Sequence, residues 1–257
     1  MADTTLPHFL ERSMRIRARR ERIFRFFTDS ERWSSWLGVG STIEPRPGGR
    51  VSIRYPNGVE AGGEVLEIEP PARLVFSFGF ASGKPMPLGA SRISLTLADE
   101  PGGTLLTLRH ELADEAARDH HVQGWRYQLA VLANAVADAQ HGAATARIDA
   151  WFAAGSEPDP SRRAEHLGDA VSAEVTFRDR FSAVEGRTDL DPHLDAIHRF
   201  MPGSRLLRSG PIRQCQGAAL ADWRATGADG TERGRGTNFF RFDADGLIEE
   251  VIGFWTG

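Results

Sequence analysis

The chain has 257 residues, of which 40% are hydrophobic and 26% are charged, as in ordinary globular proteins. Its net charge of −4 provides no overall positive field, which argues against nucleic acid or an anionic membrane as a partner. The single cysteine, Cys215, excludes an internal disulfide, and the start MADTTLPHFLERSMRIRARR lacks the apolar core of a signal peptide. We therefore expect a cytoplasmic protein without a membrane anchor.

The first half of the sequence predicts a strand, two short helices, a series of strands and a long helix. Residues 13–18 alternate in polarity and indicate an edge strand, and Ser30 is the expected N-cap of a helix that stops at Gly38. Further strands are expected at 50–55, 63–69, 73–80, 91–98 and 103–112, before a helix over 115–142. The apolar stripe of that helix comprises Val122, Trp125, Leu129, Leu132 and Val136.

The second half begins again with helices and ends with strands. Helical spacing of apolar residues is found around Trp151, over 162–171 and over 191–201. Strands are expected at 173–179, 205–214, 218–226, 236–242 and 247–255. The change from one helix to the next near Gly142 predicts a domain boundary with hardly any linker.

Several motifs of the first half occur together and in order. The segments ARRERIFRFFTDSERWSSWLG, RPGGRVSIRYPNG, VLEIEPPARLVFSF and HVQGWRYQLAVLANAV resemble the START-like (SRPBCC) family related to the activator of heat shock protein 90 ATPase. The resemblance implies a helix-grip fold over residues 1–142, in which a curved sheet and a long helix enclose a small-molecule cavity. It does not imply chaperone activity.

The second half resembles the nuclear transport factor 2-like superfamily, in its SnoaL-like and ketosteroid isomerase branch, through RIDAWFAAG, VTFRDRFSAVEGR and NFFRFDADGLIEEVIGFW. The resemblance implies an α+β cone over residues 143–257, with helices above a curved sheet and a pocket inside. We therefore expect an α+β chain, a helix-grip domain followed by a cone. The cone hosts isomerases, cyclases, hydrolases and binding proteins, so its fold does not decide the function.

Steroid isomerases of this branch move a proton with a carboxylate base, and hold the enolate with a tyrosine and a protonated aspartic acid. In the matching segments Asp179 holds the position of the base, Trp151 that of the tyrosine and Asn238 that of the acid. An amide N–H can donate to a developing oxyanion. The resemblance therefore implies Asp179 and Asn238 as catalytic residues, while Trp151 departs from the pattern and indicates a different substrate.

Strand alternation supports the same placement. Asp179 faces inward if its neighbours Arg178 and Arg180 face water, and Asn238 shares a strand face with two phenylalanines. Alternatively, Asp179 is a surface or arginine-paired carboxylate and Asn238 bonds to neighbouring backbone. The expected ligand-binding residues are mainly aromatic: Trp151, Trp223, Phe240, Phe242, Phe177, Trp125 and His121.

Metal and cofactor sites are not indicated. His120 and His121 point about 100° apart on a helix, and the chain has no cysteine pairs for zinc. His121 reads either as a partly exposed helix residue or as one that reaches the cavity mouth. No phosphate loop or GxSxG motif occurs, and no Asp-Arg-Asp relay can be assembled from the strands. We expect no cofactor.

The combined interpretation is a protein that binds a small hydrophobic metabolite of polyketide or terpenoid type and, if it is an enzyme, converts that metabolite. Isomerase- or cyclase-like proton transfer would take place in the second domain. The alternative is a non-catalytic ligand-binding or chaperone-associated interaction protein. Cone domains often dimerise through their open sheet face, so we expect either a homodimer or a chain whose first domain covers that face.

Overall fold

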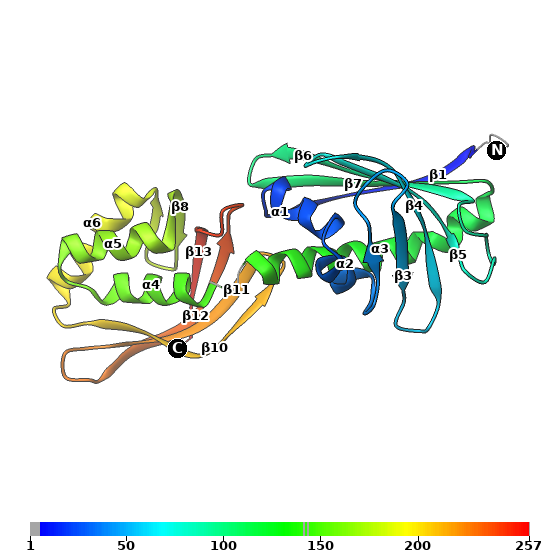
Figure 1. Ribbon diagram of the computed structural model, residues 1–257. Helices are drawn as coiled ribbons and strands as arrows, with labels where there is room; N and C mark the ends of the chain where they lie inside the picture. The colour runs from blue at the N-terminus through cyan, green and yellow to red at the C-terminus, as the bar shows by residue number, and fades with distance from the viewer. Residues whose placement is uncertain (1–5, 141, 143, 257) are drawn as a thin grey trace. The chain divides into compact units, whose positions relative to one another are not determined.

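The computed structural model describes residues 6–140, 142 and 144–256 (Figure 1). The chain forms two compact units, Met1–Ala137 and Asp138–Gly257, each with its own sheet and hydrophobic core. This confirms the expected α+β chain with a helix-grip domain followed by a cone. The division falls within the last turns of a long helix, shortly before the expected limits of 1–142 and 143–257, which stay a prediction.

The first unit folds a seven-stranded sheet against the long helix α3, in the strand order β1-β7-β6-β5-β4-β3-β2 (Figure 1). Every neighbouring pair is antiparallel. The strand predicted over 13–18 is the edge strand β1. The elements are β1 (His8–Ile16), α1 (Arg20–Phe24), η1 (Arg25–Phe27), α2 (Ser30–Leu37), β2 (Thr42–Ile43), β3 (Arg50–Arg54), β4 (Glu60–Glu69), β5 (Arg73–Phe80), β6 (Ser91–Glu100), β7 (Gly103–Leu112) and α3 (Glu115–Gln140).

The ends of α2 follow from local hydrogen bonds and sterics. The expected N-cap was Ser30, but the side chain of Asp29 accepts the Arg32 N–H and caps the helix, while the Ser30 hydroxyl bonds to Ile43. At the other end Gly38 adopts a φ of +122°, and a Cβ there would lie 2.0 Å from the Arg54 carbonyl oxygen. Only glycine fits that position.

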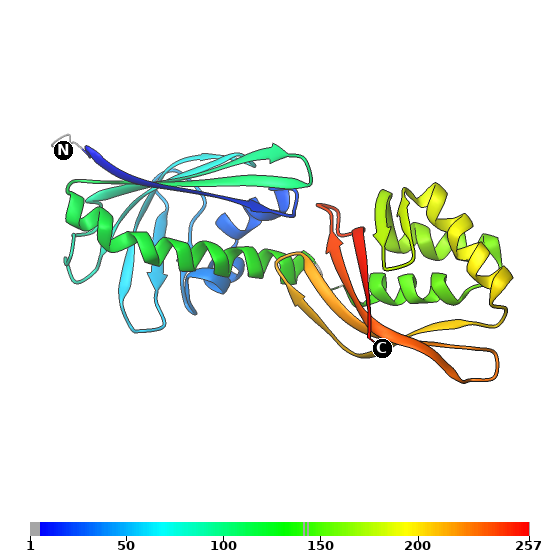
Figure 2. The same cartoon turned by 180° about the vertical axis from the view of Figure 1, so that it is seen from behind.

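The second unit places three helices over one face of a six-stranded sheet, which curves around them in Figure 2. The strand order is β10-β11-β12-β13-β8-β9, with β13 and β8 parallel and the other pairs antiparallel. The elements are α4 (Ala144–Ser156), α5 (Pro160–Ala170), β8 (Val171–Arg178), β9 (Ala183–Glu185), α6 (Arg187–Phe200), β10 (Arg205–Cys215), β11 (Ala218–Thr226), β12 (Glu232–Phe242) and β13 (Ile248–Trp255).

The boundary between the first two helices of this unit is a capped helix start. Asp159 accepts hydrogen bonds from the backbone N–H groups of Ser161 and Arg162, and Pro160 occupies the first helical position, where no N–H is needed. The helix α5 then packs on α4 and α6. These contacts hold the three helices together above the sheet.

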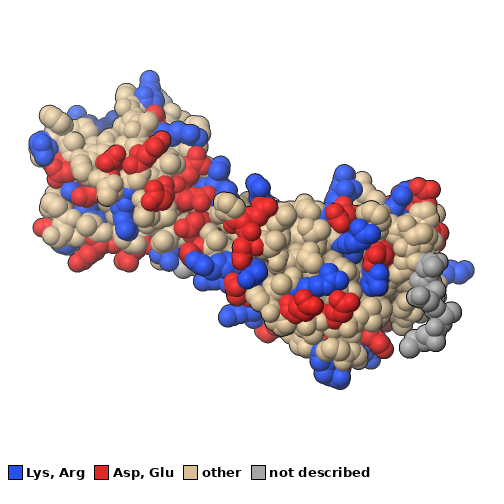
Figure 3. Space-filling model, turned by 90° about the horizontal axis from the view of Figure 1, so that it is seen from above, with Lys and Arg blue, Asp and Glu red and all other residues tan. Residues whose placement is uncertain are grey.

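Acidic and basic side chains are intermixed on the faces of both units drawn in Figure 3. Among the described residues, no helix combines the length and the apolar character that crossing a bilayer requires.

Candidate functional site

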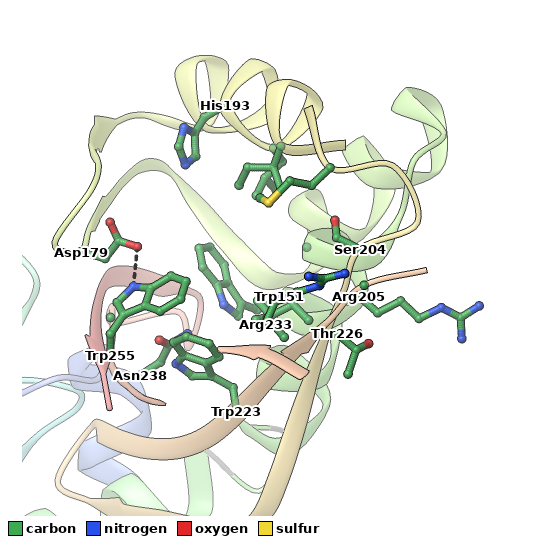
Figure 4. A pocket seen from close by; sticks show the side chains of 18 of the residues that line it. Trp151, Asp179, His193, Ser204, Arg205, Trp223, Thr226, Arg233, Asn238 and Trp255 are labelled. Carbon is green, nitrogen blue, oxygen red and sulfur yellow. Dashed lines mark hydrogen bonds between the residues drawn. The ribbon is translucent and has the colours of Figure 1, made fainter. Parts of the chain in front are cut away.

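The second unit contains a cavity of about 690 Å³ between its helices and its sheet. Helices α4 and α6 contribute one wall, and strands β11, β12 and β13 contribute the other. Figure 4 shows Trp151, Asp179, Trp223 and Asn238 around this space below α6, whereas the side chain of Arg205 points away from it. The lining residues used below are Trp151, Phe177, Asp179, His193, Ile197, Arg205, Trp223, Asp229, Arg233, Asn238, Gly253 and Trp255.

Asp179 lies directly after β8 and reaches the cavity through a tight turn. Its N–H donates to the Ser182 carbonyl at 2.9 Å, and its Oδ1 accepts the backbone N–H of Phe181 at 2.8 Å. Its Oδ2 accepts the indole N–H of Trp255 at 3.0 Å, the dashed line in Figure 4. The flanking Arg178 is exposed, as is Arg180, in agreement with the alternation argument. The carboxylate is therefore oriented from two sides.

Asn238 lies on the buried face of β12 and is 4% exposed. Its neighbours on that face, Phe240 and Phe242, are fully buried, which is the period-two pattern expected for the strand. Across the sheet Asn238 pairs with Ala221 on β11 and with Gly253 on β13. Small residues on both sides leave open space above the amide, and the cavity occupies that space.

Gly253 brings the two polar groups together. A Cβ on this residue would lie 3.1 Å from Cβ of Asp179 and 3.4 Å from Oδ1 of Asn238. The absence of a side chain therefore lets the carboxylate and the amide approach the same point of the cavity wall. Sequence patterning had indicated Asp179 and Asn238 separately, and the register of β13 explains why they become neighbours.

Three tryptophans line the cavity. Trp223 and Trp255 flank Gly236 on adjacent strands, with ring centroids 4.8 Å apart. A Cβ on Gly236 would lie 2.7 Å from Cζ2 of Trp223, so the glycine leaves room for the pair. Trp151 comes from α4 and packs against the cavity residue Phe177 at 5.7 Å between centroids. The ring nitrogens of Trp151 and Trp223 are buried and have no partner within the described residues.

Two predicted ligand-binding residues of this domain lie in the core instead. Phe240 and Phe242 are fully buried and are not among the residues that line the cavity. Phe240 supports the wall from behind, since its ring packs against Trp151 at 6.2 Å and against Phe152 at 6.3 Å. Sequence reasoning did not single out His193, Gly253 or Trp255. The alternation of β13, which puts Trp255 on the face of Val251, was the signal for Trp255.

The two predicted ligand-binding residues of the first unit belong to its core. Trp125 is 3% exposed and His121 is 8% exposed, so His121 is not the partly exposed helix residue considered from the sequence. It is buried because it packs against the rings of Phe78 and Phe80 at 5.8 Å, and its Nδ1 donates to the Ala117 carbonyl. Binding of a ligand by either residue stays a prediction.

His110 on β7 is a buried residue that sequence reasoning missed. The Trp125 indole N–H donates to its Nδ1 at 3.1 Å, so Nε2 carries the proton and donates to Oγ of Ser91 at 2.9 Å. Ser91 in turn donates to the Phe78 carbonyl. Burial, together with a smaller effect of the neighbouring His121, lowers the pKa of His110 to about 2. His110 is therefore neutral at physiological pH.

An Asp-Arg-Asp cluster does form in the second unit, but from helices rather than from strands. Arg163 is 1% exposed and bonds to Asp191 at 2.7 Å and to Asp195 at 3.2 Å. It also donates to the carbonyls of Glu157 and Pro158. None of the three charged residues lines the cavity, so the cluster joins α5 to α6. Within the described parts of the chain, no group of three or more His, Cys, Asp or Glu is placed to hold a metal ion.

Comparison with known proteins gives a family match for the first unit. Residues 17–137 match the family described as activator of Hsp90 ATPase homolog 1-like protein. No curated protein matches the chain.

Solved structures similar to the chain each cover about half of it. A SnoaL-like family protein from Agrobacterium tumefaciens is 25% identical, covering 46% of this chain and 99% of its own, with a TM-score of 0.43. CalU16 from Micromonospora echinospora is 27% identical, covering 48% of this chain and 71% of its own, with a TM-score of 0.41. The Aha1 dimer from Colwellia psychrerythraea is 17% identical, covering 48% and 90%, with a TM-score of 0.41. The first half of the chain thus resembles the activator of Hsp90 ATPase homolog 1-like family, whose model it matches over residues 17–137.

Proposed function

We propose that the second unit binds a small, largely apolar metabolite, of polyketide or terpenoid type, and catalyses an isomerase- or cyclase-like proton transfer on it. One observation carries this proposal. Asp179 and Asn238, which are far apart in the sequence, meet at Gly253 on the wall of a cavity of about 690 Å³. An apolar cavity with a few convergent polar groups is typical of a small-molecule site.

The proposed reaction uses the two groups in different roles. Asp179 removes a proton from the carbon next to a substrate carbonyl, and the electron pair of the broken C–H bond moves to the carbonyl oxygen. The Asn238 amide N–H donates to that oxygen as it becomes an enolate. The enolate then collapses in one of two ways. It takes the proton back from Asp179 at another carbon, or it forms a carbon–carbon bond to a second carbonyl carbon of the same molecule, whose C=O π electrons move to that oxygen, which then takes the proton from Asp179.

The hydrogen bonds of Asp179 suit this role. Trp255 and the Phe181 N–H hold its two oxygens, and each carboxylate oxygen keeps a second lone pair for the substrate proton. A carboxylate fixed in this way loses little freedom when substrate binds, which favours proton transfer. The surrounding indoles exclude bulk water and so strengthen the interaction of Asn238 with the developing charge.

The test is exchange of the α-protons of 2-tetralone in D₂O, followed by proton NMR with the full chain. We expect the wild type to accelerate exchange over buffer, and Asp179→Asn to slow the catalysed exchange by roughly 10²- to 10⁴-fold, because it removes the base. Asp229→Asn is the matched control, since Asp229 also lines the cavity but pairs with Arg233. An unchanged rate in Asp179→Asn, or an equal loss in the control, contradicts the assignment.

The rival function is ligand binding without chemistry, as in a carrier or a chaperone-associated interaction protein. Two observations favour it: both oxygens of Asp179 already accept internal hydrogen bonds, and Trp151 holds the position where related isomerases keep a tyrosine. In that case 2-tetralone binds to the wild type in equilibrium dialysis, but its α-protons exchange at the buffer rate.

Homodimer formation and a cytoplasmic location also stay predictions. Sedimentation equilibrium of the full chain tests the first, and we expect a mass of two chains if the open sheet face of the cone is the dimer interface.

A further inference from the structure

His193 on α6 places an imidazole without a partner in the cavity wall. The residue lines the cavity and is half-buried. Among the described residues, neither of its ring nitrogens makes a hydrogen bond or an ion pair. The unpartnered nitrogens that are closed off from solvent include Nε2 of His198 on the same helix, but neither nitrogen of His193. Both nitrogens of His193 are therefore accessible, on a residue that lines the cavity.

The packing of α6 determines where this imidazole lies. Its ring contacts the ring of Phe177, with centroids 5.8 Å apart, and Phe177 lies two residues before Asp179 near the end of β8. Figure 4 shows His193 pointing from α6 into the space above Asp179. His193 therefore faces the end of the cavity that holds the carboxylate, from the opposite wall.

Ion pairs on the other side of α6 fix the rotation of the helix. Asp191 and Asp195 lie two positions before and after His193, which is about 200° around the helix in each direction. Both bind Arg163 of α5, at 2.7 Å and 3.2 Å. Because the helix is anchored on this side, its opposite side, which carries His193, is held toward the cavity.

The fixed position of Asp179 leaves one step of a cyclisation without a well-placed acid. Its two oxygens are held by the N–H groups of Phe181 and Trp255, so the carboxyl stays on one face of the planar enolate. The second carbonyl of the substrate attacks from the other face, which is the side of α6. An acid for its oxygen must lie within hydrogen-bond reach of that side.

The other ionisable side chains of the cavity lining do not meet this requirement. Asp229 and Arg233 pair with one another at 3.2 Å. Arg205 points away from the cavity in Figure 4, and a guanidinium does not release a proton at neutral pH. Imidazole is the side chain that most often transfers protons at neutral pH, which leaves His193 as the acid on the α6 side.

We propose that His193 is a second catalytic residue, which protonates the second carbonyl oxygen when a diketone cyclises in the cavity. Asp179 takes the α-proton, and the enolate forms the carbon–carbon bond while the C=O π electrons of the second carbonyl move to its oxygen. The protonated imidazole of His193, in place of Asp179, gives that oxygen its proton. Water then takes the proton from Asp179, and neutral His193 takes one from water. This role rests on the proposed function and narrows the substrate to compounds with two carbonyl groups.

The test compares two reactions of the full chain that share the base but not the acid. Exchange of the α-protons of 2-tetralone needs no second carbonyl, whereas heptane-2,6-dione cyclises to 3-hydroxy-3-methylcyclohexanone, which is followed by chromatography. His193→Phe keeps a ring against Phe177 but has no proton to give. We expect this variant to slow the catalysed cyclisation by roughly 10²- to 10⁴-fold and to leave the exchange unchanged. Asp179→Asn should slow both reactions.

The matched control is His198→Gln, since His198 lies on the same helix but is not among the residues that line the cavity, and it should leave both reactions unchanged. In His193→Ala, added imidazole should restore cyclisation, which a merely structural role of His193 does not predict. The assignment is overturned, and the proposed function kept, if the wild type exchanges 2-tetralone but does not accelerate cyclisation, or if His193→Phe cyclises at the wild-type rate or loses both reactions equally. A wild type that accelerates neither reaction overturns both.

Discussion

The buried His110 of the first unit gives a prediction whose size can be worked out. Its Nδ1 accepts the Trp125 N–H. A proton added to Nδ1 would replace this hydrogen bond with two N–H donors that face each other, in a site that water does not reach. Burial lowers the pKa of His110 from 6.5 to about 2. The unfolded chain therefore binds a proton at this residue over a pH range in which the folded chain does not.

The sign and magnitude follow from linkage. The contribution of neutral His110 to stability is complete above pH 6.5, and it is lost as the pH falls from 6.5 toward the folded-state pKa of about 2. Each pH unit in that window removes about 1.4 kcal/mol, so acidification from pH 7.5 to 5.0 should cost the first unit about 2 kcal/mol through this residue. In His110→Gln, which cannot titrate, this part of the pH dependence should disappear.

Hydrogen exchange of the β7 amides, measured by mass spectrometry and corrected for the intrinsic effect of pH, reports the opening free energy of the first unit at both pH values. His120→Gln is the matched control, because His120 is the exposed neighbour of His121 on α3 and should leave the pH dependence unchanged. The reasoning is refuted if wild type and His110→Gln lose the same free energy between pH 7.5 and 5.0.

Two further predictions concern the second unit. Gly253→Ala places a Cβ 3.1 Å from Cβ of Asp179, so we expect the α-proton exchange rate to fall at least about tenfold while the melting temperature changes little; an unchanged rate contradicts the proximity argument. Arg163→Met leaves two half-exposed carboxylates without their shared partner and should lower the unfolding free energy by about 2 kcal/mol in urea titrations. The exposed Arg162→Met should cost less than about 0.5 kcal/mol, and equal losses would show that the Arg163 cluster is not stabilising.

The sequence pattern predicted correctly which side chains are buried where a single strand or helix periodicity determines the face that points to the core. The alternation of β12 predicted that Asn238 shares the buried face of Phe240, and the structure confirms it. The stripe on α3 predicted Trp125 and Leu129 as buried residues. It did not place His121 in the core, because its burial depends on the rings of β5, which no helical period encodes.

The candidate site depended on register and close approach, which a single sequence does not encode. The meeting of Asp179 and Asn238 requires the pairing of Asn238 with Gly253 and the parallel placement of β8 beside β13. The hydrogen bond from Trp255 to Asp179 joins residues that are 76 positions apart in the sequence. The unsatisfied nitrogens of Trp151 and Trp223 became visible only once the packing around each indole was known.

The central claim is that the cavity of the second unit is the ligand site. A crystal structure of the full chain soaked with 2-tetralone tests it most directly. We predict density for the ketone between α6 and β12, with its carbonyl oxygen within hydrogen-bond distance of Asn238 and its α-carbon facing Asp179. Density for the ketone in the first unit alone, or an unoccupied second cavity at a saturating concentration, would contradict the account.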